Sequence, residues 1–267
     1  MSKAIAIGIT GVALSFAMLA AGFVSGNRHD LGAAPALADG ARPSLAQVTS
    51  RADVEAIVRS YLIENPEILT EMQIVLEDRQ REEQRLALLD TLANSSDALF
   101  NATYDGVVGN PEGSVTVVEF FDYNCGFCKR AYDDMAAMVA ADDDLRFVLK
   151  EFPILGPDSH KAHMVSMAFR ALAPEQYGEF HRRLLMGARA TEDAAILAAV
   201  ELGVDEATLR EEMKNPAIVE AFGETYELAS RLAITGTPSY VIGDEVVFGA
   251  LGQAVLREKV ELARAQD

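Results

Sequence analysis

Two cysteines stand three residues apart where a buried strand gives way to a helix. Residues 115–121 are β-branched and aromatic and predict a central strand, and turn residues 122–124 follow them. Cys125-Gly126-Phe127-Cys128 comes next, with a helix expected from about Cys128 to Ala140. The 267-residue chain has no other cysteine, which excludes a small disulfide-stapled scaffold. A chain of this length can bury a core of its own.

The position of Cys125 suits a nucleophile. It precedes a helix N-terminus, where free N–H groups and the helix dipole stabilise a thiolate. A thiolate attacks disulfides, and a second thiol three residues on can displace the resulting mixed disulfide within the same chain. We therefore assign Cys125 as the nucleophile and Cys128 as the resolving thiol.

Two other interpretations of the cysteine pair stay open. A structural disulfide would close a four-residue loop, which restricts the unfolded chain little and so stabilises weakly. Alternatively, the thiolates could hold zinc or Cu(I), with His160 and His163 completing the ligand set, but the interval between the cysteines and these histidines is long for a zinc site. We expect His160 and His163 to be surface or boundary residues, and His29 and His181 to form no constellation.

The order of predicted elements indicates an α/β fold: a small mixed sheet with a helical insertion. Residues 145–152 form a second strand, parallel to the first because a helix connects the two. Helices with starts at Thr191, Asp205 and Asn215-Pro216 fill residues from about 159 to 232. Residues 239–242 and 245–248 form a hairpin across Gly243-Asp244, and a helix over 252–265 ends the chain.

Residues 4–24 are apolar and follow Lys3, which indicates an export signal. In one interpretation the segment is cleaved at Ala36-Leu37-Ala38. In the other it stays as a membrane anchor, with residues 32–43 as a flexible tether. Both interpretations place the body of the protein outside the cytoplasm, most simply in a periplasm, where a disulfide can persist.

Residues 39–98 predict a helical stalk. An amphipathic helix begins near Ala52, Asn65-Pro66 suits the N-cap and first position of a second helix, and residues 77–85 are a solvated polar stretch. Short amphipathic helices must bury their apolar face somewhere. We expect them to do so against other copies of the chain; the alternative is that they pack on the main domain.

The net charge of −18, from 23 basic and 41 acidic residues, argues against a nucleic-acid partner. It does not select any other substrate. The dithiol chemistry needs no organic cofactor.

The segment from Phe120 to Lys129 resembles the active-site segment of DsbA-like thiol:disulfide oxidoreductases. Residues 236–243 (GTPSYVIG) resemble the cis-proline loop of that family. The helical block between the two motifs has the length of the family's insertion. The resemblance implies a thioredoxin fold over residues 99–267, with a helical insertion at about 159–232, preceded by the N-terminal helical stalk.

The same resemblance implies roles for single residues. Pro238 would be in cis, and Thr237 would present its backbone beside Cys125, where an extended substrate can pair. Gly126 and Phe127 would also contact substrate. Glu119 matches a buried acidic residue that relays protons to Cys128; from the residues alone it is a lone carboxylate in an apolar strand, expected to titrate high if buried.

Residues 53–85 are similar to the N-terminal region of the ScsC-like (suppressor of copper sensitivity) and Com1-like branch. Some members of that branch are trimeric isomerases, and others are monomeric oxidants. Strongly oxidising members have Pro-His between the cysteines, whereas this chain has Gly126-Phe127, so we expect a less oxidising dithiol. The Gly-aromatic pair resembles the isomerase branch, in which a membrane partner keeps the dithiol reduced.

These inferences predict an extracytoplasmic thiol:disulfide oxidoreductase or isomerase that acts on cysteine-containing exported proteins, as a possible homotrimer. A copper- or zinc-handling thiol protein, or a chaperone-like module, is the alternative. The direction of the reaction stays open.

Overall fold

The computed structural model describes residues 50–265 of the chain. Its contacts divide the chain into two compact units, residues 1–72 and residues 73–267. The predicted signal or anchor over residues 4–24, the cleavage motif at 36–38 and the tether over 32–43 lie outside the described residues. Within residues 50–265, no helix has the length and apolar character that crossing a membrane requires.

Helix α2 (Arg51–Glu64) begins at Ser50, whose side chain accepts from the N–H of Asp53 in a capping box. Helix α3 (Glu67–Asn94) follows the predicted break at Asn65-Pro66. The prediction that Asn65 caps α3 is wrong. Its side chain instead donates to the carbonyl oxygen of Tyr61 at 2.8 Å, so Asn65 closes the C-terminus of α2.

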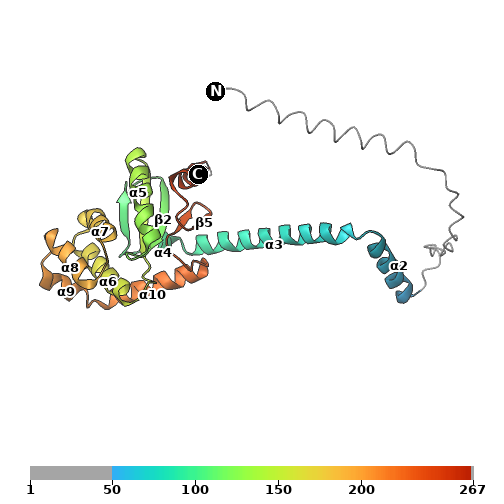
Figure 1. The fold of residues 1–267 in the computed structure, drawn as a ribbon, viewed down its shortest axis with the longest axis horizontal. Helices are drawn as coiled ribbons and strands as arrows, with labels where there is room; N and C mark the ends of the chain where they lie inside the picture. Colours follow the sequence, from blue (N-terminus) through green and yellow to red (C-terminus); the bar gives the residue numbers. More distant parts are fainter. Residues whose placement is uncertain (1–49, 266–267) are drawn as a thin grey trace, which may run out of the picture. The chain divides into compact units, whose positions relative to one another are not determined.

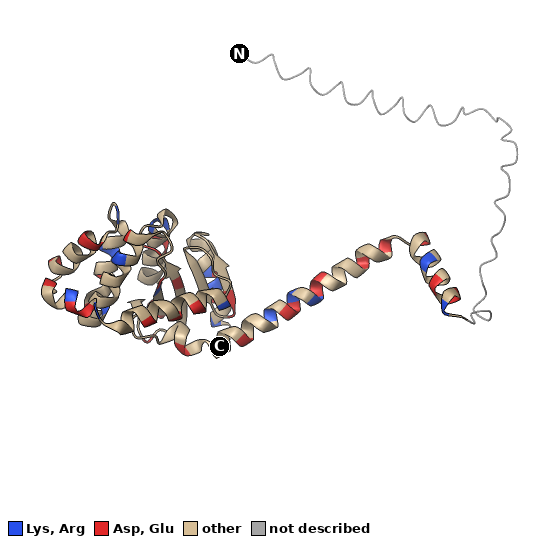
Figure 2. Ribbon diagram, turned by 90° about the horizontal axis from the view of Figure 1, so that it is seen from below, with Lys and Arg blue, Asp and Glu red and all other residues tan. Residues whose placement is uncertain are grey.

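The polar stretch over residues 77–85 is the exposed middle of α3, as predicted. Acidic and basic residues are both present along it (Figure 2), and Arg85 pairs with Glu82 at 2.9 Å. Such exposed pairs stabilise a helix only modestly. The stretch is one continuous helix because it contains neither glycine nor proline.

The end of the predicted stalk contributes to the core of the second unit. Leu92 near the end of α3 and Leu99 of α4 (Ser96–Phe100) are buried in one hydrophobic cluster with residues of the central strands. The compact unit begins at Gln73, so residues 73–98 of the predicted stalk belong to it by their contacts.

Within residues 50–265 the sheet has five strands in the order β1-β3-β2-β4-β5; β2 and β5 are labelled in Figure 1. They are β1 (Gly106–Gly109), β2 (Val115–Phe121), β3 (Leu145–Glu151), β4 (Ser239–Ile242) and β5 (Glu245–Phe248). β2 and β3 are parallel, β4 and β5 form the predicted hairpin, and β1 lies antiparallel to β3. We did not predict β1, because a four-residue strand with glycine at both ends has a weak sequence signal.

The helices that follow β2 agree with the predicted order. They are α5 (Gly126–Ala141), α6 (Pro157–Leu172), the 3-10 turn η2 (Pro174–Gln176), α7 (Tyr177–Met186), α8 (Glu192–Glu201), α9 (Glu206–Glu212), α10 (Pro216–Arg231) and α11 (Gln253–Arg264). α6 to α10 form the insertion between β3 and β4. The predicted starts are confirmed, since the side chains of Thr191, Asp205 and Asn215 each accept a hydrogen bond from a first-turn N–H.

The sheet separates two hydrophobic clusters. On β2, Val117 and Phe121 belong to the cluster that holds both cysteines, whereas Val118 and Phe120 belong to the cluster of Leu92 and Leu99. This is the alternation expected of a strand buried on both faces. The same alternation places Glu119 on the face of the cysteines.

Candidate active site

The two cysteines lie at the start of α5. The helix begins at Gly126, two residues earlier than predicted, and extended Cys125 is its N-cap residue. Both cysteines are buried free thiols; Cys125 is 6% exposed and Cys128 1% exposed. Cys125 is thus the more accessible of the two thiols.

The surroundings of Cys125 favour its thiolate. A hydrogen bond with the Cys128 side chain is the largest cause that lowers the pKa of Cys125, to about 5, and Thr237 and the N–H groups of Cys128 and Phe127 contribute too. Burial opposes the shift. These N–H groups are the ones that a helix N-terminus leaves free.

The surroundings of Cys128 have the opposite effect. Burial is the main cause that raises the pKa of Cys128, and the hydrogen bond to Cys125 and the charge of Glu119 raise it further. The pair therefore holds one thiolate, at Cys125, and one thiol, at Cys128.

Glu119 is buried on β2, opposite Tyr240 of β4 in the strand register. Burial raises the pKa of Glu119 to about 8, and the negative charge of Cys125 adds to the shift. The sequence-based expectation that this carboxyl titrates high is confirmed. A carboxyl with this pKa exchanges a proton near neutral pH.

The loop before β4 brings a backbone acceptor to the nucleophile. The Thr237–Pro238 bond is cis, as the resemblance implied, and the Cys125 thiol donates to the carbonyl oxygen of Thr237 at 3.2 Å. The carbonyl oxygen of Pro238 accepts a hydrogen bond from the N–H of Gly249 at 2.9 Å.

The residues between the cysteines face outwards. Gly126 is exposed, and 58% of the Phe127 surface is accessible. The guanidinium carbon of Arg130 lies 4.3 Å from the centroid of the Phe127 ring. A partner that approaches Cys125 therefore meets an aromatic ring held under a cation.

The predicted surface position holds for His160 but is wrong for His163. His163 of α6 is wholly buried, and its ring nitrogens contact the N–H of Tyr123 and the carboxylate of Glu151. His181 of α7 is also buried, among aromatic rings that include Tyr123, a packing that the sequence did not predict. Sequence reasoning missed this cluster because its members come from three separate elements. The one available signal was Glu151, a carboxylate at the end of an apolar strand.

The residues 50–265 bring no three His, Cys, Asp or Glu side chains together in an arrangement that could hold a metal ion. In particular, His163 is engaged with Glu151 and the Tyr123 backbone rather than with the cysteines. The four-ligand set considered from the sequence therefore does not form.

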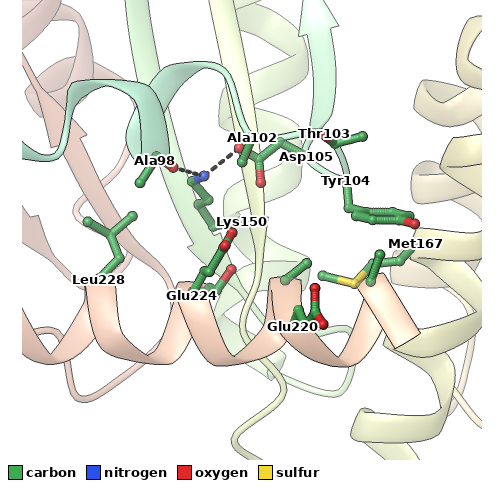
Figure 3. A pocket seen from close by; sticks show the side chains of 13 residues that line it. Ala98, Ala102, Thr103, Tyr104, Asp105, Lys150, Met167, Glu220, Glu224 and Leu228 are labelled. Carbon is green, nitrogen blue, oxygen red and sulfur yellow. Dashed lines mark hydrogen bonds and ion pairs between the residues drawn. The ribbon is translucent and has the colours of Figure 1, made fainter. Parts of the chain in front are cut away.

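A separate pocket lies between α4, β3 and α10 (Figure 3). Lys150 is buried there and binds Asp105 and the carbonyl oxygen of Ala98. Burial raises the pKa of Asp105 to about 7. None of the predicted site residues lines this pocket.

These features define a thioredoxin-like dithiol protein. The sheet is mixed and carries a helical insertion, the two cysteines lie at a helix N-terminus, and the cis-proline loop contacts the first sulfur. The sequence profile of the DSBA-like thioredoxin domain matches residues 116–261, more than half of the chain. The chain belongs to this family of DsbA-like thiol:disulfide oxidoreductases. A second profile, the copper resistance protein ScsC N-terminal domain, matches residues 51–83.

Individual relatives agree with this assignment. A thioredoxin-like oxidoreductase from Silicibacter pomeroyi is 40% identical, with a TM-score of 0.60 over 63% of this chain and 97% of that chain. A linker-deletion mutant of Proteus mirabilis ScsC is 27% identical, with a TM-score of 0.62 over 85% of this chain and 100% of that chain. Disulfide bond formation protein D of Bacillus subtilis is 24% identical over 58% of this chain and 75% of that protein.

Proposed function

We propose that this protein exchanges disulfides with cysteine-containing exported proteins, with Cys125 as the nucleophile and Cys128 as the resolving thiol. The opposite pKa shifts of the two thiols carry this proposal, because they leave one thiolate at the more accessible sulfur. Thr237 and Pro238 form the edge on which an extended substrate pairs, and Gly126 and Phe127 contact it.

The exchange proceeds in two steps, formation of a mixed disulfide and its resolution. The Cys125 thiolate attacks one sulfur of a substrate disulfide, forming a mixed disulfide and releasing the other substrate sulfur as a thiolate. Cys128 then loses its proton and attacks the Cys125 sulfur, which releases the second substrate thiol. The substrate gains two electrons, and the enzyme ends with a Cys125–Cys128 disulfide. The reverse sequence oxidises a substrate dithiol.

Glu119 supplies the proton acceptor for the second step. Cys128 is held as a thiol, so it needs a base as it attacks. The charge of Glu119 acts on Cys128, and the pKa of about 8 at Glu119 suits a group that takes and returns a proton near neutral pH.

The dithiol is less oxidising than one with Pro-His between the cysteines, and a membrane thiol partner returns it to the reduced state for isomerisation. The absence of a histidine between Cys125 and Cys128 supports this direction, since a nearby imidazolium stabilises a thiolate. Titration of the pair against glutathione tests it: a poise as oxidising as the strongest members of the family would contradict an isomerase.

We also propose that residues 39–98 form an oligomerisation stalk that makes the chain a trimer, on the domain of residues 99–267, outside the cytoplasm. Apolar side chains are exposed on α2 and the start of α3: Val54, Val58, Tyr61, Ile63, Leu69 and Met72. Such a surface is favourable only when covered. The apolar run over residues 4–24 supports export of the chain.

Substitution of each cysteine tests the chemistry. Cys125→Ser should abolish reduction of insulin and refolding of scrambled ribonuclease, whereas Cys128→Ser should accumulate mixed disulfides that a non-reducing gel resolves. Full activity of the Cys125→Ser variant would overturn the proposal. The thiol metal-binding alternative would be favoured if the protein kept stoichiometric copper or zinc through gel filtration and did not react with disulfides.

A further inference from the structure

A buried chain of hydrogen bonds ends two residues before the nucleophile. The carboxylate of Glu151, at the end of β3, contacts Nδ1 of His163 on α6. Nε2 of the same ring lies 3.1 Å from the backbone nitrogen of Tyr123. Glu151, His163 and Tyr123 are all 0% exposed. The chain therefore connects the helical insertion to the active-site loop without a path through solvent.

The contacts fix the proton of the His163 ring. A backbone N–H can only donate, so Nε2 must carry a free lone pair to accept from Tyr123. The imidazole is then neutral, with its proton on Nδ1, and this N–H donates to Glu151. Glu151 also accepts from the hydroxyls of Ser166 at 2.6 Å and Tyr177 at 2.8 Å, so its carboxylate is surrounded by donors.

The backbone N–H groups of residues 123–125 differ in where their hydrogen-bond acceptors lie. The N–H of Asn124 donates to the Asp122 side chain at 2.8 Å, and the N–H of Cys125 donates to the Asp122 backbone at 2.9 Å. Both acceptors belong to the loop itself. The Tyr123 N–H is held by a residue 40 positions away. Its contact with His163 ties the loop backbone to the insertion, in addition to the side-chain hydrogen bonds of Asp122 with Leu155 and Ser159 and of Asn124 with Ser159 and Ala190.

We infer that His163, held as the Nδ1–H tautomer by Glu151, is a positioning residue that sets the place of the Cys125 sulfur through the backbone of Tyr123. The inference rests on the proposed function, because it concerns the same nucleophile. His163 touches neither cysteine in any hydrogen bond among the described residues. It acts through the loop: without the acceptor, a buried N–H is unpaired and the loop must move to satisfy it.

Movement of the loop would change the contacts of Cys125. Its sulfur lies near the N–H groups of Phe127 and Cys128 at the start of α5, which favour the thiolate, and these contacts depend on where residue 125 stands. Because a hydrogen bond weakens steeply with distance and angle, a small displacement lowers the thiolate fraction of Cys125. A group that only added stability would leave this fraction unchanged in the folded protein.

The experiment compares three variants of the full-length chain. His163→Leu removes the acceptor, and His163→Gln retains an oxygen that can accept from Tyr123. His181→Leu is the matched control: it removes another buried imidazole, whose contact is with the Tyr123 hydroxyl at 3.3 Å rather than with the backbone. The readout is the pH dependence of alkylation at Cys125, measured on protein that near-ultraviolet circular dichroism shows to be folded.

His163→Leu should lower the thiolate reactivity of Cys125 at about pH 6 by roughly tenfold, the effect of losing one buried hydrogen bond. His163→Gln should recover most of it, and His181→Leu should lose stability without this change. Equal alkylation profiles for wild type and His163→Leu would overturn the inference, as would equal losses in both leucine variants.

Nitrogen-15 NMR of the wild-type imidazoles provides a measurement that does not depend on any variant folding. It should find His163 neutral with its proton on Nδ1. An Nε2–H tautomer or an imidazolium would overturn the inference. A wild-type protein without disulfide-exchange activity would contradict the proposed function. An active wild type whose Cys125 thiolate fraction is the same in His163→Leu would contradict only the role of His163.

Discussion

The sulfur of Cys125 lies 3.2 Å from the carbonyl oxygen of Thr237, although 112 positions separate the two residues in the chain. This contact joins the two sequence motifs into one site. It also leaves the Thr237 backbone beside the sulfur that a substrate must reach. The loop backbone at Thr237 is therefore the proposed site for an extended substrate chain.

Cys125 should react as a thiolate down to about pH 5, its lowered pKa. Alkylation of the reduced protein, followed by mass spectrometry of the peptide that contains Cys125, measures the midpoint. Cys128 should stay unreactive at neutral pH, since burial raises its pKa. A midpoint near 9.0, the ordinary value, would contradict the electrostatic account.

The lowered pKa of Cys125 also links stability to pH. The folded state favours the thiolate, so the contribution is complete above pH 9.0 and is lost as the pH falls to 5. Denaturant unfolding of reduced wild type should therefore show stability rising with pH across this window relative to Cys125→Ser. A parallel pH dependence in the two proteins would argue against a perturbed thiol.

Glu119→Gln should slow resolution of the mixed disulfide by roughly 10²-fold, the usual scale of general acid–base catalysis. The first attack by Cys125 should be little affected. Stopped-flow kinetics with a model disulfide separates the two steps. An unchanged second step would leave Glu119 without a role in proton transfer.

The same Glu119→Gln variant should be more stable than wild type at high pH. The pKa of Glu119 rises from 4.5 to about 8 on folding, so wild type loses stability as the pH increases between these values. The full difference is roughly 5 kcal/mol, from about 1.4 kcal/mol for each of the 3.5 pKa units. Urea titrations of the oxidised proteins, in which Cys125 carries no charge, measure the part of this difference that burial causes.

Leu99→Ala should destabilise the second unit by about 3 kcal/mol, because Leu99 is 0% exposed in the cluster beneath β2 and β3. Leu197→Ala on α8 is the control, since 59% of that side chain is exposed and its loss should cost less than about 0.5 kcal/mol. Similar midpoints of urea unfolding for the two variants would show that α4 is not part of the cooperative domain.

Val58→Glu should convert an oligomer of the full-length chain into a monomer. Val58 is 50% exposed on α2, in an apolar patch with Val54 and Leu62. Covering a charge there would cost several kcal/mol per copy. Ser60→Glu adds the same charge at an exposed polar position of the same helix and should leave the oligomer intact. Light scattering that finds a wild-type monomer would contradict the stalk proposal.

The sequence by itself determined the parts of the site that are local. The strand over residues 115–121, the turn and the two cysteines are contiguous, so periodicity and helix capping suffice to place Cys125 at a helix start. The burial of Glu119 followed from its place in an apolar strand. The cis peptide at Pro238 came from a resemblance between motifs.

Tertiary structure alone decided the parts that join distant elements. His163 and His181 read as unremarkable helix residues, but the contacts of α6 with the end of β3 and the packing of α7 on β1 bury them beside Tyr123. Asn65 is a residue type that favours the N-cap position, yet its side-chain amide donates to a carbonyl oxygen at the C-terminus of the preceding helix. Leu92 and Leu99 follow the solvated stretch of α3 but lie in the core, because they pack in one cluster with side chains of β2 and β3. Periodicity records which residues prefer burial, and only the three-dimensional fold supplies their partners.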